Sequence, residues 1–189
     1  MKIIHTADWH IGKVLHKEPL NDDIRMFFDW LEAYIYAEVP DVLLISGDIY
    51  DFANPSNKDQ EMYYSMLSRL AKTGITTIIT GGNHDSVSLL NAPKPLLKNF
   101  KIHVLGGIDE NLEKHIISIK NKDGNLACVI LAVPFLRERD LKTADTADKM
   151  TDDIDSVSLA VKSYYDRWVE MAQEKFGNDV PIIAMGHLF

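Results

Sequence analysis

The sequence has 189 residues, 46% of them hydrophobic and 25% charged, which is the composition of an ordinary globular domain. It contains no run of about 18 apolar residues, and its N-terminus lacks the features of a signal peptide, so neither a membrane span nor export is expected. A formal net charge of −8 argues against a protein that coats nucleic acid, and the single cysteine, Cys128, excludes an internal disulfide and indicates a buried thiol in a cytoplasmic protein.

The first half of the chain alternates apolar strand candidates with amphipathic helix candidates. Strands are predicted at residues 2–6, 41–46 and 74–80, and helices at 22–38 and 57–72. Met62, Met66 and Leu70 form one apolar stripe on the second helix, so this face is expected to pack in the core. Ser56 is the expected N-cap of this helix, and Gly74 is the residue expected to end it.

The second half is predicted to be rich in strands before it returns to a helix and a final strand. Strands are predicted at residues 102–105, 116–120, 128–133 and 181–185, and the helix at 156–176. The acidic stretch at 143–155 is predicted to be a mobile surface loop. Together the two halves predict one α/β domain over residues 1–189, with helices on both sides of packed sheets.

Four short polar segments follow apolar strands. They are Asp8-Trp9-His10, Gly47-Asp48, Gly82-Asn83-His84-Asp85 and Gly186-His187. Ligands and catalytic groups of layered α/β proteins collect at strand ends, where loops can be shaped without disturbing the core. Each segment alone is a weak signal, because Asp-x-His and Gly-Asp occur by chance and Gly and Asn are common in turns. The ordered set of four indicates a functional site.

The residue types in these segments are compatible with one metal centre. Asp8 and His10 are two residues apart, so a regular strand would place them on the same side, where they could chelate one ion. Asp48 has two carboxylate oxygens with which to bridge two ions, while Asn83 and His187 offer a carbonyl oxygen and an imidazole nitrogen. Mixed oxygen and nitrogen ligation suits Mn²⁺, Fe²⁺ or Zn²⁺ better than Mg²⁺.

The set of four segments resembles the calcineurin-like metallophosphoesterase superfamily, and the flanking residues resemble its SbcD nuclease family. The segments that carry this resemblance, in the same order, are residues 5–12, 47–51, 82–86, 133–140 and 181–188. The Pro-Phe-Leu-Arg-Glu-Arg-Asp sequence at 134–140 separates SbcD-like proteins from other phosphatases of the superfamily. The resemblance runs along the whole chain and implies a sandwich of two packed mixed β-sheets flanked by helices.

The resemblance also implies a metal-dependent nuclease that hydrolyses DNA phosphodiester bonds in repair and recombination. Two divalent ions, with Mn²⁺ favoured, would be its cofactors. Asp8 and His10 would hold the first ion and Asp48 would bridge. Asn83 and His187 would hold the second ion.

His84 would be the catalytic histidine, Asp85 would orient it, and Asp51 would lie beside the metal ligands. The side chains that could touch DNA phosphates are Lys13, Arg137 and Arg139. A solvated surface role, or for the two arginines an ion pair with neighbouring acidic residues, is the alternative. The negative net charge does not exclude binding of DNA at one local site, because bound divalent cations reverse the local charge.

The family pairs its nuclease subunit with an SbcC-like ATPase and forms homodimers, so both partners are expected. It also has a further His-x-His pair after the segment that matches Gly186-His187, and this chain stops at Phe189 without it. The chain is therefore expected to be a C-terminally truncated N-terminal fragment with weak metal binding and little activity of its own. The alternatives are a phosphatase or nucleotide phosphodiesterase of the same superfamily, or a non-catalytic scaffold.

Overall fold

The computed structural model describes residues 1–141 and 154–188 of the chain. Its larger sheet consists, in chain order, of β1 (Ile3–Ala7), β4 (Val42–Ser46), β5 (Thr76–Thr80) and β6 (Ile102–Leu105). The smaller sheet consists of β7 (Ile116–Lys120), β8 (Leu126–Ala132) and β9 (Ile182–Met185). Two short strands, β2 (Val14–Leu15) and β3 (Glu18–Pro19), form a hairpin.

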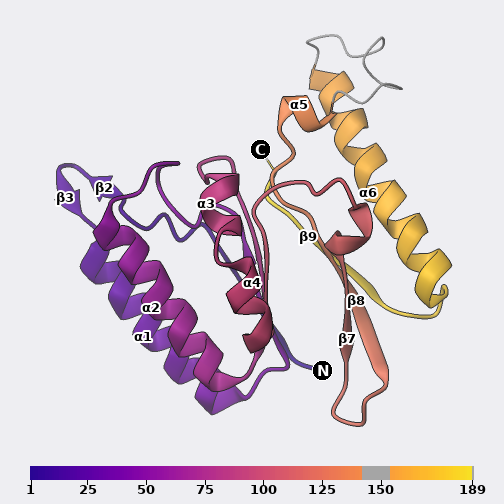
Figure 1. Ribbon diagram of the computed structural model, residues 1–189, viewed down its shortest axis with the longest axis horizontal. Helices are drawn as coiled ribbons and strands as arrows, with labels where there is room; N and C mark the ends of the chain where they lie inside the picture. Colours follow the sequence, from indigo (N-terminus) through magenta and orange to yellow (C-terminus); the bar gives the residue numbers. More distant parts are fainter. Residues whose placement is uncertain (142–153, 189) are drawn as a thin grey trace.

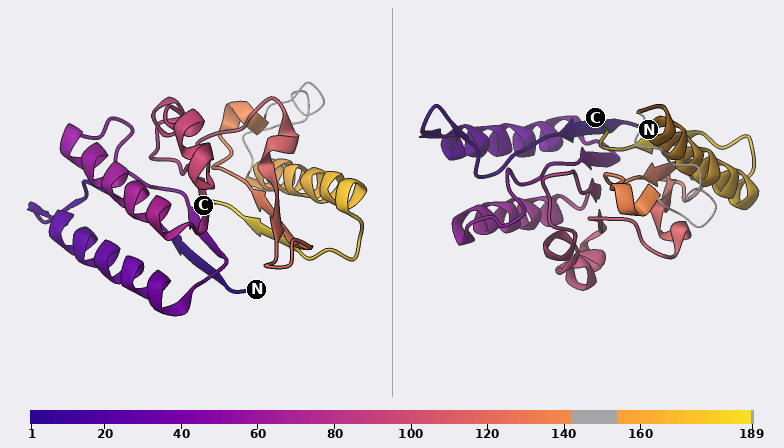
Figure 2. Two further views of the ribbon diagram at one scale, coloured as in Figure 1. Left: turned by 60° about the horizontal axis from the view of Figure 1, so that its bottom comes forward. Right: turned by 90° about the horizontal axis from the view of Figure 1, so that it is seen from above.

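Helices cover the outer faces of both sheets. Along the larger sheet they are α1 (Asn21–Glu38), α2 (Asn57–Thr73), α3 (Val87–Asn91), α4 (Lys94–Leu97) and the 3₁₀ turn η1 (Lys98–Phe100). Along the smaller sheet they are the 3₁₀ turn η2 (Leu112–His115), α5 (Glu138–Leu141) and α6 (Ile154–Phe176). The long helices α1 and α2 lie at one side of the two sheets and α6 at the other (Figures 1 and 2). No helix in the described ranges is long and apolar enough to cross a membrane.

The strand directions place the carboxyl ends of the larger sheet at one end of the molecule. Its order is β1-β4-β5-β6, and all neighbours are parallel. In the smaller sheet β7 is antiparallel to β8, and β9 is parallel to β8. The expected architecture of two packed sheets flanked by helices is confirmed, with mixed strand directions in the smaller sheet alone.

Three apolar layers form because successive side chains of a strand point to opposite faces. In β4, Leu43 and Ile45 pack against the helices, whereas Val42 and Leu44 pack between the sheets. In the smaller sheet Cys128 faces the layer between the sheets, and neighbouring residues of β8 pack against α6 in the third layer. Cys128 is a free, fully buried thiol, so its predicted role is confirmed.

The local signals read from the sequence also appear in the structure. Ser56 and Asp59 form a reciprocal capping box at the start of α2, and Gly74 ends this helix with a left-handed φ of 70°. Strands and long helices begin and end close to the predicted residues. The hairpin β2–β3 and the short helices α3, α4 and α5 were not expected. The predicted loop at 143–155 lies outside the described residues, except for its last two, which belong to α6.

Candidate metal centre

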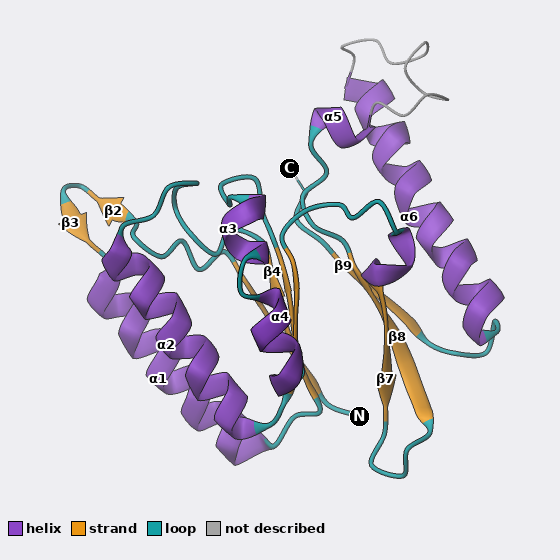
Figure 3. Cartoon of the chain, in the orientation of Figure 1, coloured by secondary structure: helices purple, strands orange, loops and turns teal. Residues whose placement is uncertain are grey.

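The loops that follow β1, β4 and β5 gather at one end of the larger sheet (Figure 3). Three of the expected ligands in these loops, Asp8, His10 and Asp48, have left-handed φ values of 55°, 44° and 44°. Such a backbone costs roughly 1–3 kcal/mol per residue, and it persists only where the surroundings fix it. Here Asp8 N donates to Gly47 O at 3.2 Å and His10 N donates to Asp48 O at 2.9 Å. The two loops therefore hold each other in strained conformations.

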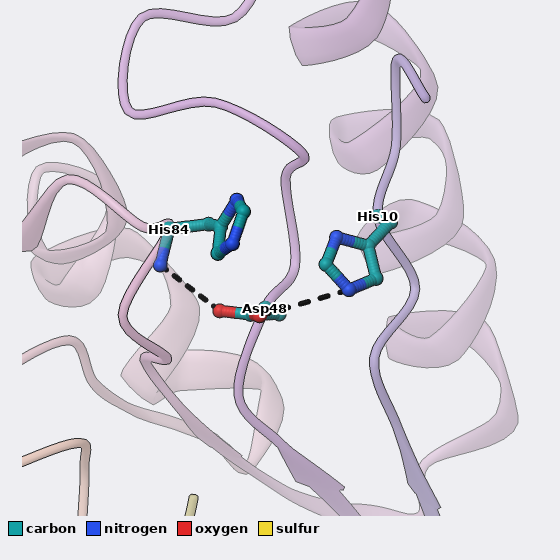
Figure 4. Close-up of side chains that lie close together, drawn as sticks. All are labelled: His10, Asp48 and His84. Atoms are coloured by element: carbon teal, nitrogen blue, oxygen red, sulfur yellow. Dashed lines mark hydrogen bonds and ion pairs between the residues drawn. The ribbon is translucent and has the colours of Figure 1, made fainter. Parts of the chain in front are cut away.

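Asp48 lies at the centre of the site. Its side chain is almost fully buried, and Oδ1 accepts a 3.0 Å hydrogen bond from the His84 backbone N–H. Oδ2 lies 3.6 Å from His10 Nε2 and 3.4 Å from His187 Nε2. Figure 4 shows His10 and His84 on opposite sides of this carboxylate. Asp48 thus contacts histidines from three different loops.

Two groups of possible ligands meet at Asp48. One contains His10, Asp48 and His84, and the other contains Asp8, Asp48 and His187. In each group the ligand atoms lie within 4.8 Å of one another. Two overlapping groups with one shared carboxylate are an arrangement that can hold two neighbouring cations bridged by that carboxylate. The donor set of imidazole nitrogens and carboxylate oxygens fits divalent cations of the transition series.

The grouping differs from the one that strand geometry predicted. The strand β1 ends at Ala7, so the rule that places residues two apart on one side of a strand does not govern Asp8 and His10. Asp8 Oδ1 instead lies 3.9 Å from His187 Nδ1, and His187 Nε2 lies 3.0 Å from Asn83 Oδ1. All five expected metal ligands are therefore close together, although Asp8 groups with His187 and His10 groups with His84.

Asp51 contacts both histidines of the first group. His84 Nδ1 lies 2.6 Å from the Asp51 carbonyl oxygen, which can only accept, so Nδ1 carries the proton of this hydrogen bond. The other ring nitrogen of His84, Nε2, is then left for the reaction or for an ion. His10 Nδ1 lies 3.0 Å from Asp51 Oδ1 as an ion-pair contact without hydrogen-bond alignment. Asp51 therefore orients the His84 imidazole through its carbonyl oxygen and lies beside the imidazole of His10.

Asp85 has a different role from the one expected. Its carboxylate is buried and accepts hydrogen bonds from the backbone N–H groups of Gly82, Ile49 and Tyr50, at 2.8, 3.0 and 3.0 Å. Burial raises the pKa of Asp85, and the three N–H donors counteract part of this increase. The expectation that Asp85 orients the ring of His84 is corrected, because Asp51 makes that contact. Asp85 instead joins the loop after β5 to the loop after β4.

Two glycines of the polar segments are explained by close approach of other residues. A Cβ atom at Gly82 would collide with the side chain and backbone nitrogen of Asp48, and one at Gly47 would collide with the ring of His187. Gly47 also has a φ of 69°, which L side chains rarely adopt. The sequence patterns Gly-Asp and Gly-Asn-His-Asp are therefore spatial requirements of the site.

The three cations that were expected to touch DNA lie in different surroundings. Lys13 Nζ is 3.8 Å from Asp51 Oδ1, at the edge of the site. Arg137 donates a 2.8 Å hydrogen bond to the Asp85 carbonyl oxygen. Arg139 is largely exposed and lies 3.7 Å from Asp140. Lys13 and Arg139 are accessible to a ligand, while Arg137 is engaged with the loop that carries His84.

Sequence reasoning missed the contribution of Phe135 to the site. Its ring packs edge-on against that of His187, with centroids 6.2 Å apart, and its backbone N–H donates to Gly81 O at 2.8 Å. The signal for this role was the position of the residue, three places after β8, inside the segment that distinguishes SbcD-like sequences.

Known proteins resemble this chain along nearly its whole length. The model of the calcineurin-like phosphoesterase family matches residues 1–188. The SbcD subunit of the nuclease SbcCD from Rhodobacter capsulatus is 34% identical over 196 aligned residues, which cover all of this chain and 48% of that protein. The proteins of the same name from Escherichia coli K12 and Bacillus subtilis are 26% and 29% identical over all of this chain and 46% and 47% of their own lengths. The chain thus spans about half the length of the curated relatives it matches.

Proposed function

Because the chain belongs to the calcineurin-like phosphoesterase family, we propose that it carries the metal-dependent phosphodiesterase site of a DNA nuclease. The observation that carries this proposal is the pair of His/Asp groups that share Asp48. The alignment of the whole chain with SbcD subunits of SbcCD nucleases supports a nuclease over a phosphatase of the same superfamily. We infer that the substrate is DNA, that the partner is an SbcC-like ATPase, and that the protein acts on DNA in the cytoplasm.

The residues that would hold two cations are Asp8, His10, Asp48, Asn83 and His187, with Asp48 shared. Mn²⁺ is the proposed ion, because nitrogen and oxygen donors are mixed in this set. When bound, such cations lower the pKa of water toward neutrality and stabilise negative charge on phosphoryl oxygens.

His84 would hold the proton that the leaving oxygen of the DNA strand needs. The Asp51 carbonyl fixes the Nδ1–H of its ring, so Nε2 is the atom that can carry or deliver that proton. The backbone N–H of His84 is bonded to Asp48, so the same residue is positioned against the shared metal ligand. Lys13 and Arg139 are proposed contacts to DNA phosphates at the edge of the site.

The proposal is tested by substrate preference. With Mn²⁺, the full-length protein should cleave linear DNA and bis(p-nitrophenyl) phosphate, a diester, at least about tenfold faster than the monoester p-nitrophenyl phosphate, and EDTA should abolish each reaction. A preference for the monoester with intact DNA would instead support the phosphatase alternative.

A second experiment tests whether further histidines complete the site. It compares metal titration and cleavage by residues 1–189 with those by a C-terminally extended version. Equal affinity and equal turnover would contradict that expectation.

We also propose that two copies associate through an apolar groove between α2 and α4. The groove has a volume of about 510 Å³ and is lined mainly by Tyr64, Leu67, Ala71, Pro93, Leu96, Leu97 and Phe100. Leu96 and Phe100, which line the groove, are 63% and 44% exposed, so each copy offers an apolar surface that a second copy can cover. A two-fold dimer uses such self-complementary surfaces.

Leu96→Glu should raise the dissociation constant of this dimer at least about 30-fold, because it places a charge on the apolar surface that the second copy would cover. Light scattering of the purified protein over a concentration series measures it. The matched control is Met26→Glu, an exposed apolar position on α1 that does not line the groove. A wild-type protein that stays monomeric at high micromolar concentration, or equal weakening by both variants, contradicts the proposed interface.

A further inference from the structure

The proposed ligands come from both sheets. Asp8, His10, Asp48 and Asn83 follow strands of the larger sheet, whereas His187 follows β9 of the smaller sheet. His187 Nε2 nevertheless lies 3.0 Å from Asn83 Oδ1 and 3.4 Å from Asp48 Oδ2. These ligands meet only if the ends of the two sheets keep fixed positions relative to each other.

The chain that leaves β8 makes this connection. Residues 133–137, called here the connecting segment, form hydrogen bonds to both sheets at the end that carries the site. Val133 N donates to Met185 O at 3.1 Å within the smaller sheet, and Phe135 N donates to Gly81 O at 2.8 Å in the loop after β5. The ring of Phe135 packs against that of His187. One segment thus contacts Gly81, two residues before Asn83, and the ring of His187.

Arg137, the last residue of the connecting segment, forms a direct hydrogen bond to the loop that carries His84. Its guanidinium donates a 2.8 Å hydrogen bond to the carbonyl oxygen of Asp85, one residue after His84. Its backbone N–H is bonded to Asp140 Oδ2 at 3.0 Å, which fixes the backbone from which the side chain extends. A hydrogen bond from a charged donor is stronger than one from a neutral donor. The loop with Asn83 and His84 is therefore held from two directions, by Phe135 at Gly81 and by Arg137 at Asp85.

We propose that Arg137 is a positioning residue, whose guanidinium fixes the loop of Asn83 and His84 against His187 through the carbonyl oxygen of Asp85. It acts on protein backbone, and this role replaces the expected contact with a DNA phosphate. The inference rests on the proposed function for its consequence in catalysis, whereas the hydrogen bonds of Arg137 and Phe135 to the loop do not depend on that function. A misplacement of about 1 Å in a catalytic group can reduce a rate about 100-fold.

The test compares Arg137→Gln and Arg137→Lys with Lys122→Gln, which removes one positive charge from an exposed turn between β7 and β8. Hydrogen exchange of the metal-free proteins is measured first. The N–H groups of Gly82 and His84 are bonded to Asp85 and Asp48, so both are protected while the loop stays in place. Arg137→Gln should accelerate their exchange at least about tenfold without changing exchange in α2, and Lys122→Gln should match wild type. Arg137→Lys should show an intermediate rate, because an ammonium can also donate to a carbonyl.

Mn²⁺ binding and hydrolysis form the second measurement. Arg137→Gln should weaken Mn²⁺ binding about 10-fold or more and lower kcat about 10–100-fold for DNA and for bis(p-nitrophenyl) phosphate alike, with the KM for DNA unchanged. Guanidinium ion added to Arg137→Ala should restore part of the rate. A DNA contact would behave differently: the small diester would be hydrolysed normally, and the salt dependence of DNA binding would fall by about one unit.

Two results would overturn the positioning role. One is unchanged exchange at Gly82 and His84, and the other is a loss confined to DNA with normal Mn²⁺ binding. If full-length wild-type protein hydrolyses neither substrate, the proposed function fails, while the exchange and Mn²⁺ measurements still decide the role of Arg137. The Tm of each variant is also measured in the absence of metal. A global loss of stability would lower the Tm and accelerate exchange in α2 as well.

Discussion

Asp48→Ala should abolish the binding of both divalent ions and reduce hydrolysis to background. The residue is shared by both groups of possible ligands, so its removal takes a ligand from each ion at once. Loss of residues that only support metal ligands weakens binding by about 10–100-fold, and loss of a shared ligand is expected to exceed this range. Mn²⁺ titration by calorimetry and cleavage of DNA, measured on the same preparation, give the two quantities.

Thermal unfolding separates loss of metal from loss of fold in Asp48→Ala. A ligand that binds only the folded state stabilises it, so Mn²⁺ should raise the Tm of wild-type protein and leave that of the variant unchanged. The control is Asp123→Ala, which removes a carboxylate from an exposed turn and should respond to Mn²⁺ like wild type. Two equivalents of bound Mn²⁺ and near-normal cleavage in Asp48→Ala would remove this residue from the site.

His84→Ala should separate hydrolysis from metal binding. The proposal makes His84 a proton donor and not a ligand, so Mn²⁺ affinity should stay within about threefold of wild type while DNA cleavage falls about 10²–10⁴-fold. This rate loss corresponds to about 3–5 kcal/mol of transition-state stabilisation. Because bis(p-nitrophenyl) phosphate has a leaving group that needs little protonation, its hydrolysis should fall much less than that of DNA.

The alternative for His84 is ligation, since it also lies in one group with His10 and Asp48. In that case metal content and both hydrolysis rates would fall together in His84→Ala. His84→Gln serves as the second variant, because it keeps a polar side chain and the backbone hydrogen bond to Asp48. Parallel loss of Mn²⁺ and of both activities in the two variants would make His84 a ligand and leave the proton donor unassigned.

Local order was predictable because it depends on neighbours along the chain. The apolar stripe of α2 and its capping residue Ser56 follow from helical spacing and from the unpaired N–H groups of a helix start. The buried strands β4 and β8 follow from continuous apolar runs, which need cover on both faces. The short helices α3 and α4 have no comparable periodicity, because each is too short to repeat an apolar stripe.

The residues of the candidate site were predictable from the sequence, whereas the contacts between them depend on the tertiary structure. Asp8, His10, Asp48 and Asn83 were predicted because carboxyl ends of parallel strands meet at one edge, and His187 was predicted from its place after the last strand. Which of them touch depends on partners far apart in the chain: His187 meets Asn83 across 104 residues, and His84 meets the Asp51 carbonyl across 33. Backbone carbonyls and N–H groups carry no sequence signature, so the roles of Asp51, Asp85 and Arg137 emerge only once the two sheets have packed and brought these groups within bonding distance.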